Sequence, residues 1–397
     1  MPTLQPTENW EYGFTDVVKG LAAALGREKM NVSLHVPQIG DCIPTRSGRA
    51  GIVAALKALD LPAGACIAVP LYCCPVVFKA VKAAGFSLRF IDVEPTTFCM
   101  SAEDLRAKSS QVDAVIAVHM FGNMCDMSGL KDAAQGKPLI EDCAQSLGSM
   151  IDGRMAGSFG TVSVFSFRLG KYLSVGEGGA VFSSDPHIYS RLCEVIAEMP
   201  SHDLRAECVH VLVTYIRSLL RSTPLYGIIG HRIWRLYNNR VDFTAQSPVI
   251  LNQIYRADFV HTVARLARLD SAIEHQRANA EHYLRSLNLD PAMLCLEKPS
   301  VFYNRFMFPI LLPSPEIRDR IAAYLYHRKI DTSQPYKNIA HVAAAHYGYT
   351  GDCPTAKQVA QRVLVIPSHH RLEPGMVSYI SQCLNDGIKH ITNNSRL

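Results

Sequence analysis

The stretch of sequence that decides the fold is residues 138–182, which read PLIEDCAQSLGSMIDGRMAGSFGTVSVFSFRLGKYLSVGEGGAVF. Its first three residues, 138–140, form a short apolar run that predicts a buried strand. Glu141 and Asp142 follow at the carboxyl end of that strand, which is the end where open α/β sheets bind their ligands. Asp142 is therefore placed to meet a ligand.

A second predicted strand carries a hydroxyl group and leads to a lysine. Residues 161–167 are rich in β-branched and aromatic side chains, which favours a strand, and Ser166 lies near its end. Lys171 follows, and the glycine-rich sequence 176–179 then predicts a turn into a further strand at 180–183. We expect the hydroxyl and the amine to lie at a strand end, as the preceding carboxylate does.

A carboxylate, a hydroxyl and an amine that converge at strand ends suit pyridoxal phosphate better than any other cofactor. This cofactor requires an acid beside its pyridinium nitrogen, donors for its phosphate and a lysine amine for a Schiff base. Asp142, Ser166 and Lys171 supply these three groups. We predict that Asp142 and Lys171 are catalytic, with Lys171 moving a proton as general base and acid after the amino donor displaces it.

Three motifs in this stretch resemble the DegT-type (DegT/DnrJ/StrS-like) sugar aminotransferases, which are fold type I pyridoxal phosphate enzymes. The motifs are Glu-Asp-Cys-Ala-Gln at 141–145, Ser-Phe-x-x-x-Lys at 166–171 and Gly-Glu-Gly-Gly at 176–179. Their order and the separation of 29 residues between Asp142 and Lys171 are similar to that family. The resemblance extends over about residues 40–200 and 255–390.

The resemblance implies the fold and two further cofactor contacts. Gln145 would lie beside the ring oxygen of the cofactor, and Ser166 would bind its phosphate. The expected α/β fold has a large domain around a mostly parallel central sheet and a smaller C-terminal α+β domain. We place the large domain at residues 1–250, with an insertion at about 205–243, and the linking helix and small domain at 251–397. A length of 397 residues also indicates two domains.

A predicted helix start upstream offers a second part of the phosphate site. Ser47 and Gly48 precede an apolar helical pattern, so the amides of the first turn are free to hold an anion. The resemblance implies that this loop binds the cofactor phosphate, with Arg49 standing where the family commonly has threonine. An arginine can bind phosphate through its fork of donors. The alternative for Ser47 is an ordinary N-cap.

Residues 70–75, Pro-Leu-Tyr-Cys-Cys-Pro, match the loop that in this family lays a side chain against the cofactor ring. The family position that is often aromatic corresponds to Cys74, so we expect either Tyr72 or Cys74 to stack on the ring. The alternative for Tyr72 is a half-buried aromatic residue in a turn. His119 ends a predicted strand at 114–120, and as a lone histidine it is expected to be structural.

Bulk composition excludes several classes of protein. Hydrophobic residues make up 48%, charged residues 19%, and the net charge of +5 comes with no strongly basic domain, so we expect no nucleic acid partner. The 12 cysteines include no Cys-x-x-Cys pair or Cys/His cluster, which predicts no metal site and a reducing compartment.

The N-terminus lacks signal-peptide features, and an apolar span of about 18 residues is missing. We expect a cytoplasmic protein that is neither secreted nor membrane-spanning.

The insertion at about 205–243 departs most from the family pattern. Residues 208–241 contain no acidic residue. The same stretch has five arginines among its apolar residues, namely Arg217, Arg221, Arg232, Arg235 and Arg240. One interpretation is an interfacial hairpin that contacts the inner face of a membrane or a lipid-linked substrate. The favoured alternative is a helical cover over the active site or a dimer contact.

The spacing of apolar residues predicts one long helix from Asp258 to Leu287, which would link the two domains. The family has an asparagine just before a comparable helix, and this asparagine reaches the cofactor site of the neighbouring subunit. Asn252 is the nearest match here, displaced by about one residue. In the C-terminal part, His369 and His370 are expected to be structural or to lie near the rim of the site.

The resemblance implies transamination of a nucleotide-linked keto-sugar in the biosynthesis of cell-surface polysaccharides, with glutamate or glutamine as amino donor. It also implies a homodimer whose active sites lie between the subunits. Two alternatives stay open. One is a pyridoxal phosphate-dependent sugar dehydratase, against which Lys171 argues because the resemblance suggests that dehydratases replace this lysine. The other is a non-catalytic regulatory or lipid-associated binding protein of the same fold.

Overall fold

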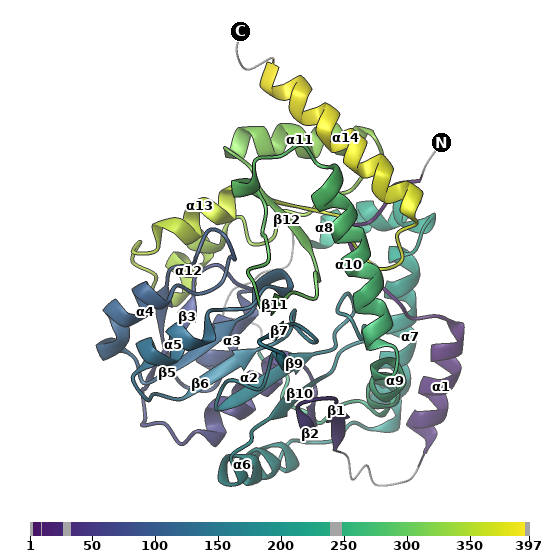
Figure 1. The fold of residues 1–397 in the computed structure, drawn as a ribbon. Helices are drawn as coiled ribbons and strands as arrows, with labels where there is room; N and C mark the ends of the chain where they lie inside the picture. Colours follow the sequence, from purple (N-terminus) through teal and green to yellow (C-terminus); the bar gives the residue numbers. More distant parts are fainter. Residues whose placement is uncertain (1–2, 9, 27–32, 239–247, 394–397) are drawn as a thin grey trace.

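The structure is a computed structural model, and it describes residues 3–8, 10–26, 33–238 and 248–393. A central sheet of eight strands occupies the lower part of the molecule, and C-terminal elements form a second lobe above it (Figure 1). In spatial order the strands are β1 (Leu34–Val36), β2 (Gly40–Thr45), β10 (Gly179–Phe182), β9 (Val162–Ser166), β6 (Leu139–Asp142), β5 (Ala114–Val118), β3 (Cys66–Pro70) and β4 (Ser87–Ile91). The predicted α/β fold with a mostly parallel central sheet is confirmed.

The register of this sheet aligns the strand ends that carry functional groups. Strands β9, β6, β5, β3 and β4 are parallel, while β10, β2 and β1 continue the sheet in antiparallel fashion. Val118 pairs with Asp142, which in turn pairs with Val164. Strands β5 and β6 end at the same level and β9 continues two residues further in the same direction, so His119, Asp142 and Ser166 come to one edge of the sheet.

Helices cover the sheet because a connection between parallel strands must cross over one of its faces. These helices are α2 (Gly48–Ala58), α3 (Val76–Ala83), α4 (Ala102–Lys108), α5 (Met127–Ala134) and α6 (Pro186–Ala197). Shorter elements are η1 (Ser109–Gln111), η2 (Met120–Gly122) and a three-stranded sheet of β7 (Met150–Ile151), β8 (Arg154–Met155) and β11 (Val301–Phe302). Helix α2 packs against α3, α6, β9 and β10, and α4 packs on α5.

One glycine determines how closely α2 approaches the sheet. A Cβ at Gly51 would lie 2.9 Å from Cγ1 of Val164 on β9 and 3.0 Å from Cγ1 of Val181 on β10. A larger residue at this position would push the helix away from the sheet. Gly51 therefore holds the amino end of α2 beside the carboxyl end of β9.

The C-terminal part of the chain builds a second hydrophobic core. Its elements are α10 (Leu269–Ser286), η4 (Pro291–Met293), β12 (Phe308–Leu311), α11 (Pro315–His327), β13 (Val363–Ile366) and α14 (Pro374–Asn393). Strands β12 and β13 pair in antiparallel fashion, and α14 packs on α10 and α11. Two further helices, α12 (Ile339–Tyr347) and α13 (Pro354–Arg362), add their side chains to the core of the large sheet instead. The domain division at residue 251 stays a prediction.

The N-terminal helix and the insertion lie side by side, on the right in Figure 1. Helices α1 (Phe14–Leu25), α7 (Leu204–Arg221) and α9 (Arg256–Leu266) contact one another, and η3 (Tyr226–Gly230) and α8 (His231–Asn238) follow α7. Arg240 lies outside the described residues, and the side chain of Arg235 is not described either. Across the described ranges, none of the helices combines the length and the apolarity needed to cross a membrane.

The single long helix predicted over residues 258–287 is wrong, because the structure has two helices there. Helix α9 ends at Leu266 and α10 begins at Leu269. Between them Arg268 has φ −117° and ψ 6°, which lie outside the α-helical region. The break has no glycine or proline to mark it, so the apolar spacing continues through it.

A buried carboxylate joins the loops that follow the central strands. Glu141 is fully buried, and its carboxylate accepts hydrogen bonds from the amides of Gly157 (2.9 Å), Phe159 (2.6 Å) and Gly160. The same carboxylate lies 3.2 Å from Nε2 of His119. Burial alone would raise the pKa of Glu141, but the hydrogen bond from His119 and those from the backbone amides outweigh it and lower the pKa.

His119 takes a structural place in this network. Its Nδ1 accepts a hydrogen bond from the amide of Cys125 at 3.1 Å, so its proton is on Nε2 and is donated to Glu141. The thiol of Cys143 lies within 4.8 Å of ligand atoms of both residues, which gives the trio the spacing of a metal site. Both ring nitrogens of His119 already have hydrogen-bond partners. These hydrogen bonds account for the short distances within the trio.

We predict that Glu141→Gln lowers the free energy of unfolding by about 3 kcal/mol, because amide donors lose a charged acceptor in the core. Urea unfolding measures this loss, with exposed Glu94→Gln as the control. The pKa of Glu141 is lowered in the folded state, so its stabilisation is complete above its ordinary value of 4.5 and is lost as the pH falls below it. Equal stability of both variants at pH 7 would contradict the role assigned to Glu141.

Candidate active site

Lys171 lies in the loop between β9 and β10, and glycine shapes this loop. The amide of Lys171 donates to the carbonyl of Arg168 at 2.9 Å. Gly170 has φ +88°, a conformation that favours glycine, and a Cβ there would also lie 2.7 Å from Oε2 of Glu8. The half-buried Lys171 side chain places Nζ 4.8 Å from the ring centroid of Phe306.

The surroundings of Lys171 favour its neutral amine. Desolvation, followed by the charge of Arg168, lowers the pKa of Lys171 to about 8. Cys74, Asp142 and Glu8 act in the opposite direction but do not restore the ordinary value of 10.5. A neutral amine is the form that attacks a carbonyl or accepts a proton, so Lys171 is prepared for both at near-neutral pH.

Asp142 ends β6 and is only 6% exposed. Its Oδ1 accepts a hydrogen bond from the amide of Ala144 at 3.0 Å. Burial raises the pKa of Asp142 above its ordinary value, although the Ala144 amide and the charge of Lys171 act against this rise. A cationic N–H group placed against the carboxylate would remove the penalty of its burial.

The predicted phosphate site brings together two distant parts of the chain. Ser47 is the N-cap of α2, and its Oγ accepts a hydrogen bond from the amide of Ala50 at 3.3 Å. A Cβ at Gly48 would lie 3.0 Å from Cβ and 3.4 Å from Oγ of Ser166, so Ser166 lies against the first turn of α2. The first-turn amides of Gly48 and Arg49 have no acceptor within the helix. These groups form a site suited to an anion.

The side chain of Arg49 is held beside this site by Glu177 in the glycine-rich turn. The Glu177 carboxylate forms an ion pair with buried Arg46 and lies 3.7 Å from the guanidinium group of Arg49. Burial would raise the pKa of Glu177, but the charges of Arg46 and Arg49 lower it. Arg49 thus stays near the amino end of α2, and its contact with phosphate stays a prediction.

Tyr72 and Cys74, the two candidates for stacking on the cofactor ring, have different surroundings. Tyr72 is fully buried, its ring lies near Phe98, Phe121 and Tyr336, and its hydroxyl donates to the carbonyl of Pro335 at 3.2 Å. Cys74 is half-buried and close enough to Lys171 to affect its pKa. Its position near Lys171 favours Cys74 over Tyr72 for stacking on the cofactor ring. The contact of either residue with that ring stays a prediction.

The side chains of Gln145 and Asn252 each form a hydrogen bond with a backbone group of the same chain. Oε1 of Gln145 accepts a hydrogen bond from the amide of Phe121 at 2.9 Å, and Nδ2 of Asn252 donates to the carbonyl of Pro200 at 3.1 Å. The contact of Gln145 with the cofactor ring and the cross-subunit role of Asn252 stay predictions.

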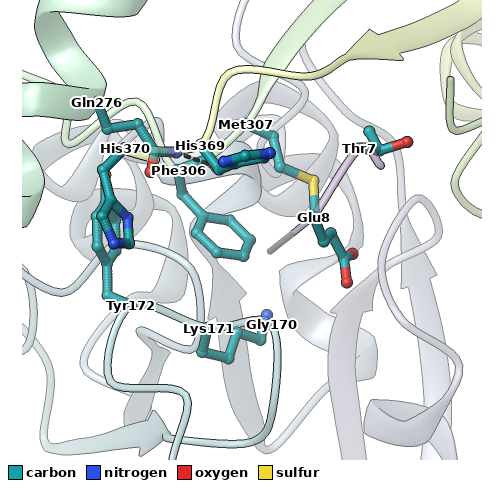
Figure 2. Close-up of a pocket in the computed structure, with 10 residues that line it drawn as sticks. All are labelled: Thr7, Glu8, Gly170, Lys171, Tyr172, Gln276, Phe306, Met307, His369 and His370. Atoms are coloured by element: carbon teal, nitrogen blue, oxygen red, sulfur yellow. Dashed lines mark hydrogen bonds between the residues drawn. The ribbon is translucent and has the colours of Figure 1, made fainter. Parts of the chain in front are cut away.

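A pocket opens beside Lys171 (Figure 2). It is lined by Thr7, Glu8, Gly170, Lys171, Tyr172, Gln276, Phe306, Met307, His369 and His370. The sequence indicated only Lys171 and, as rim residues, His369 and His370. It gave no signal for Glu8 or Phe306, because neither stands in a motif and their nearness to Lys171 depends on tertiary packing.

The residues at the sheet edge fit pyridoxal phosphate. Asp142 is a buried carboxyl group without an ion pair to any described residue, Lys171 is an amine with a lowered pKa, and Ser166 lies against the amino end of α2. These features match the ring nitrogen, the carbonyl carbon and the phosphate of the cofactor respectively. Asp142, Lys171, Ser166 and the amides of Gly48 and Arg49 would hold it.

Two curated relatives align with most of the chain. One is the GDP-perosamine synthase of Escherichia coli O157:H7, which is 26% identical over 86% of this chain and 84% of the relative. Another is the UDP-N-acetyl-3-dehydro-alpha-D-glucosamine 3-aminotransferase of Acidithiobacillus ferrooxidans, which is 27% identical over 84% of this chain and 81% of the relative. The first name contains a GDP-linked compound, and the second contains a UDP-linked glucosamine and an aminotransferase activity.

The fold and the site define a fold type I aminotransferase. A Streptococcus pneumoniae protein solved in a PMP form matches the structure with a TM-score of 0.76 over 97% of this chain and 99% of that chain, at 15% identity, and its PLP form matches with a TM-score of 0.73. The chain belongs to the DegT/DnrJ/EryC1/StrS aminotransferase family, whose model matches residues 37–206 and 260–385. The unmatched residues 207–259 contain most of the predicted insertion.

We predict that cofactor-free protein captures added pyridoxal phosphate at a rate that rises with pH and is half-maximal near pH 8, because only the neutral amine of Lys171 reacts. Stopped-flow absorbance follows the capture. Arg168→Gln removes a cation that lowers the pKa of Lys171, so the midpoint of capture by this variant moves to higher pH. The control is Lys131→Gln, because Lys131 is exposed and its replacement leaves the midpoint unchanged. A wild-type midpoint near the ordinary 10.5 would contradict the desolvated setting of Lys171.

Proposed function

We propose that this aminotransferase transfers an amino group from glutamate or glutamine to a keto-sugar linked to a nucleotide. Asp142 and Lys171, both desolvated and next to an anion site at one sheet edge, carry the proposal. The family implies pyridoxal phosphate as cofactor. The nucleotide linkage is supported by the names of the two relatives, one a GDP-sugar enzyme and one a UDP-sugar enzyme.

Different residues of this chain would have separate roles in such a transfer. When bound, pyridoxal phosphate supplies an electron sink for the charge that develops on the amino-bearing carbon. Lys171 removes a proton from that carbon and returns one, which its lowered pKa permits at near-neutral pH. Asp142 keeps the ring nitrogen protonated through an ion pair. Ser166 and the first turn of α2 hold the phosphate so that the reacting atoms stay in place.

Two other functions fit the fold less well. The resemblance suggests that sugar dehydratases of this kind replace the lysine, so the presence of Lys171, whose charge acts on Asp142, argues against a dehydratase. A binding-only protein would have no reason to desolvate a carboxylate and an amine at one site, since each such group costs stability. Full biological activity of a Lys171→Ala variant would favour the binding protein.

Helix α7 of the insertion exposes apolar side chains and buries polar ones. Its exposed apolar row consists of Val209, Leu212, Val213, Ile216 and Leu219. Its buried polar residues are Glu207, Thr214, Ser218 and Arg221. An exposed apolar row of this length on one helix is typical of a surface that contacts another surface.

Two arginines of the insertion, Arg217 and Arg221, lie against the N-terminal arm. The guanidinium carbons of Arg217 and Arg221 lie 5.6 and 4.9 Å from the ring centroid of Trp10, and Arg221 is buried. An anionic membrane would attract cations at the edge of an apolar row, whereas a second protein chain does not need them. We therefore propose that the α7 row, Val209 to Leu219, lies in the interface of a cytoplasmic homodimer.

We predict that Asp142→Asn retains bound cofactor but slows the reaction with the amino donor by about 100-fold or more, because asparagine cannot hold a positive charge on the ring nitrogen. Single-turnover absorbance with L-glutamate and with L-glutamine measures the rate, and exposed Asp132→Asn is the matched control. A rate within twofold of wild type would contradict the role of Asp142.

We predict that Leu212→Glu combined with Ile216→Glu converts the dimer to monomers, because both side chains are about half exposed in one chain and would bring charges into the interface. Sedimentation velocity measures the state, and exposed Lys131→Glu is the control. Flotation with vesicles containing phosphatidylglycerol at low salt decides the alternative. A monomeric wild type that floats with these vesicles would favour the membrane interpretation.

A further inference from the structure

The pocket beside Lys171 is built by segments that are far apart in the sequence (Figure 2). Glu8 comes from the N-terminal arm, residues 3–12, of which residue 9 is not described, while Phe306 precedes β12 and His369 follows β13. In Figure 2 the Phe306 ring lies between His369 and Lys171, with Glu8 to one side. The carboxylate, the imidazole and the aromatic ring thus surround the space next to the lysine.

His369 has polar atoms without partners. Both ring nitrogens are buried, and neither has a described residue in full hydrogen-bonding geometry, although the backbone of Pro6 lies nearby. Desolvation lowers the pKa of His369 to about 3, and the nearby carbonyl of Pro6 opposes this only in part, so the ring is neutral and offers one donor and one acceptor. Buried polar atoms normally have partners, and leaving them unpaired is unfavourable. A bound ligand in this pocket would supply them.

The N-terminal arm is anchored to the rest of the chain both before and after Glu8. The amide of Gln5 donates to the carbonyl of Lys329 at 2.9 Å, and the amide of Tyr12 donates to Oγ of Ser218 at 3.1 Å. The indole of Trp10 donates to Oε2 of Glu8 at 3.3 Å.

The C-terminal loop adds a further tie to the arm. Nε2 of His370 lies 2.7 Å and Nε of Arg371 lies 2.6 Å from Oε1 of Glu11. The arm is thus tied to the loop that also carries His369. Glu8 and His369 are therefore positioned relative to each other by the fold.

Phe306 is fixed by a helix behind it. Nε2 of Gln276 on α10 donates to the carbonyls of Arg305 (2.7 Å) and Phe306. Among the residues that line the pocket, Lys171 is the one lysine or arginine. A carboxylate placed next to Glu8 would therefore be repelled, since no second lysine or arginine of the lining offsets its charge.

We propose that Glu8 and His369 bind the ring hydroxyls of the sugar acceptor, with the apolar face of the sugar against Phe306 and its keto carbon toward Lys171. Hydroxyl groups donate to the carboxylate of Glu8, and they donate to and accept from the neutral imidazole of His369. Glu8 also selects against sugars that carry a carboxylate on the ring. This inference rests on the proposed function, because it names how that same site recognises its acceptor.

The test measures binding of sugar nucleotides to the cofactor-loaded protein by isothermal titration. UDP-glucose, GDP-mannose and dTDP-glucose are compared first, and the tightest is then paired with the uronate of the same nucleotide. We expect wild type to prefer the neutral hexose by about tenfold or more, and Glu8→Gln both to weaken hexose binding by about tenfold and to reduce this preference. His369→Phe weakens hexose binding by a similar factor, and His369→Asn, which keeps a donor and an acceptor, weakens it less.

The control variant is exposed Glu103→Gln, and thermal unfolding establishes that each variant is folded. Hexose binding and hexose-to-uronate preference that are the same in wild type, Glu8→Gln and His369→Phe would overturn the inference. The reaction of wild type with L-glutamate or L-glutamine is measured in parallel. If wild type reacts with neither, the proposed function fails, whereas a normal reaction together with unchanged sugar binding removes only the roles of Glu8 and His369.

Discussion

The proposed active site depends on two desolvated groups, the acidic carboxyl of Asp142 and the basic amine of Lys171. Burial moves their pKa values toward each other, upward for Asp142 and down to about 8 for Lys171, because each charged form is costly away from water. A ligand with a cationic ring nitrogen and an electrophilic carbonyl carbon relieves both costs. Burial of these two groups therefore lowers the stability of the folded chain, and binding of pyridoxal phosphate would restore it.

The surrounding fold keeps these two groups in register. The parallel pairing of β5, β6 and β9 brings their carboxyl ends to one edge of the sheet. Glu141 connects the loops beyond them through four hydrogen bonds, including the one from His119. Gly51 allows α2 to approach the sheet, which brings Gly48 against Ser166. The anion site and the neighbouring carboxyl and amine groups of Asp142 and Lys171 therefore lie at one edge because of strand register and helix packing.

The sequence predicted this edge because its main residues stand in one stretch, with Asp142, Ser166 and Lys171 each at or just after a strand. Apolar runs placed the strands correctly, since buried parallel strands are continuous in their apolar character. The break between α9 and α10 could not be predicted, because backbone angles at Arg268 cause it without a glycine or proline. Glu8, Phe306 and His369 were not predicted as a group, because only the tertiary fold brings them together.

The visible absorbance of the purified protein with added pyridoxal phosphate, before and after addition of L-glutamate or L-glutamine, decides whether Asp142 and Lys171 serve transamination. We expect a band of bound cofactor that Lys171→Ala lacks and that one of these amino donors bleaches in the wild type. If excess cofactor produces no band in the wild type, Asp142 and Lys171 do not serve transamination.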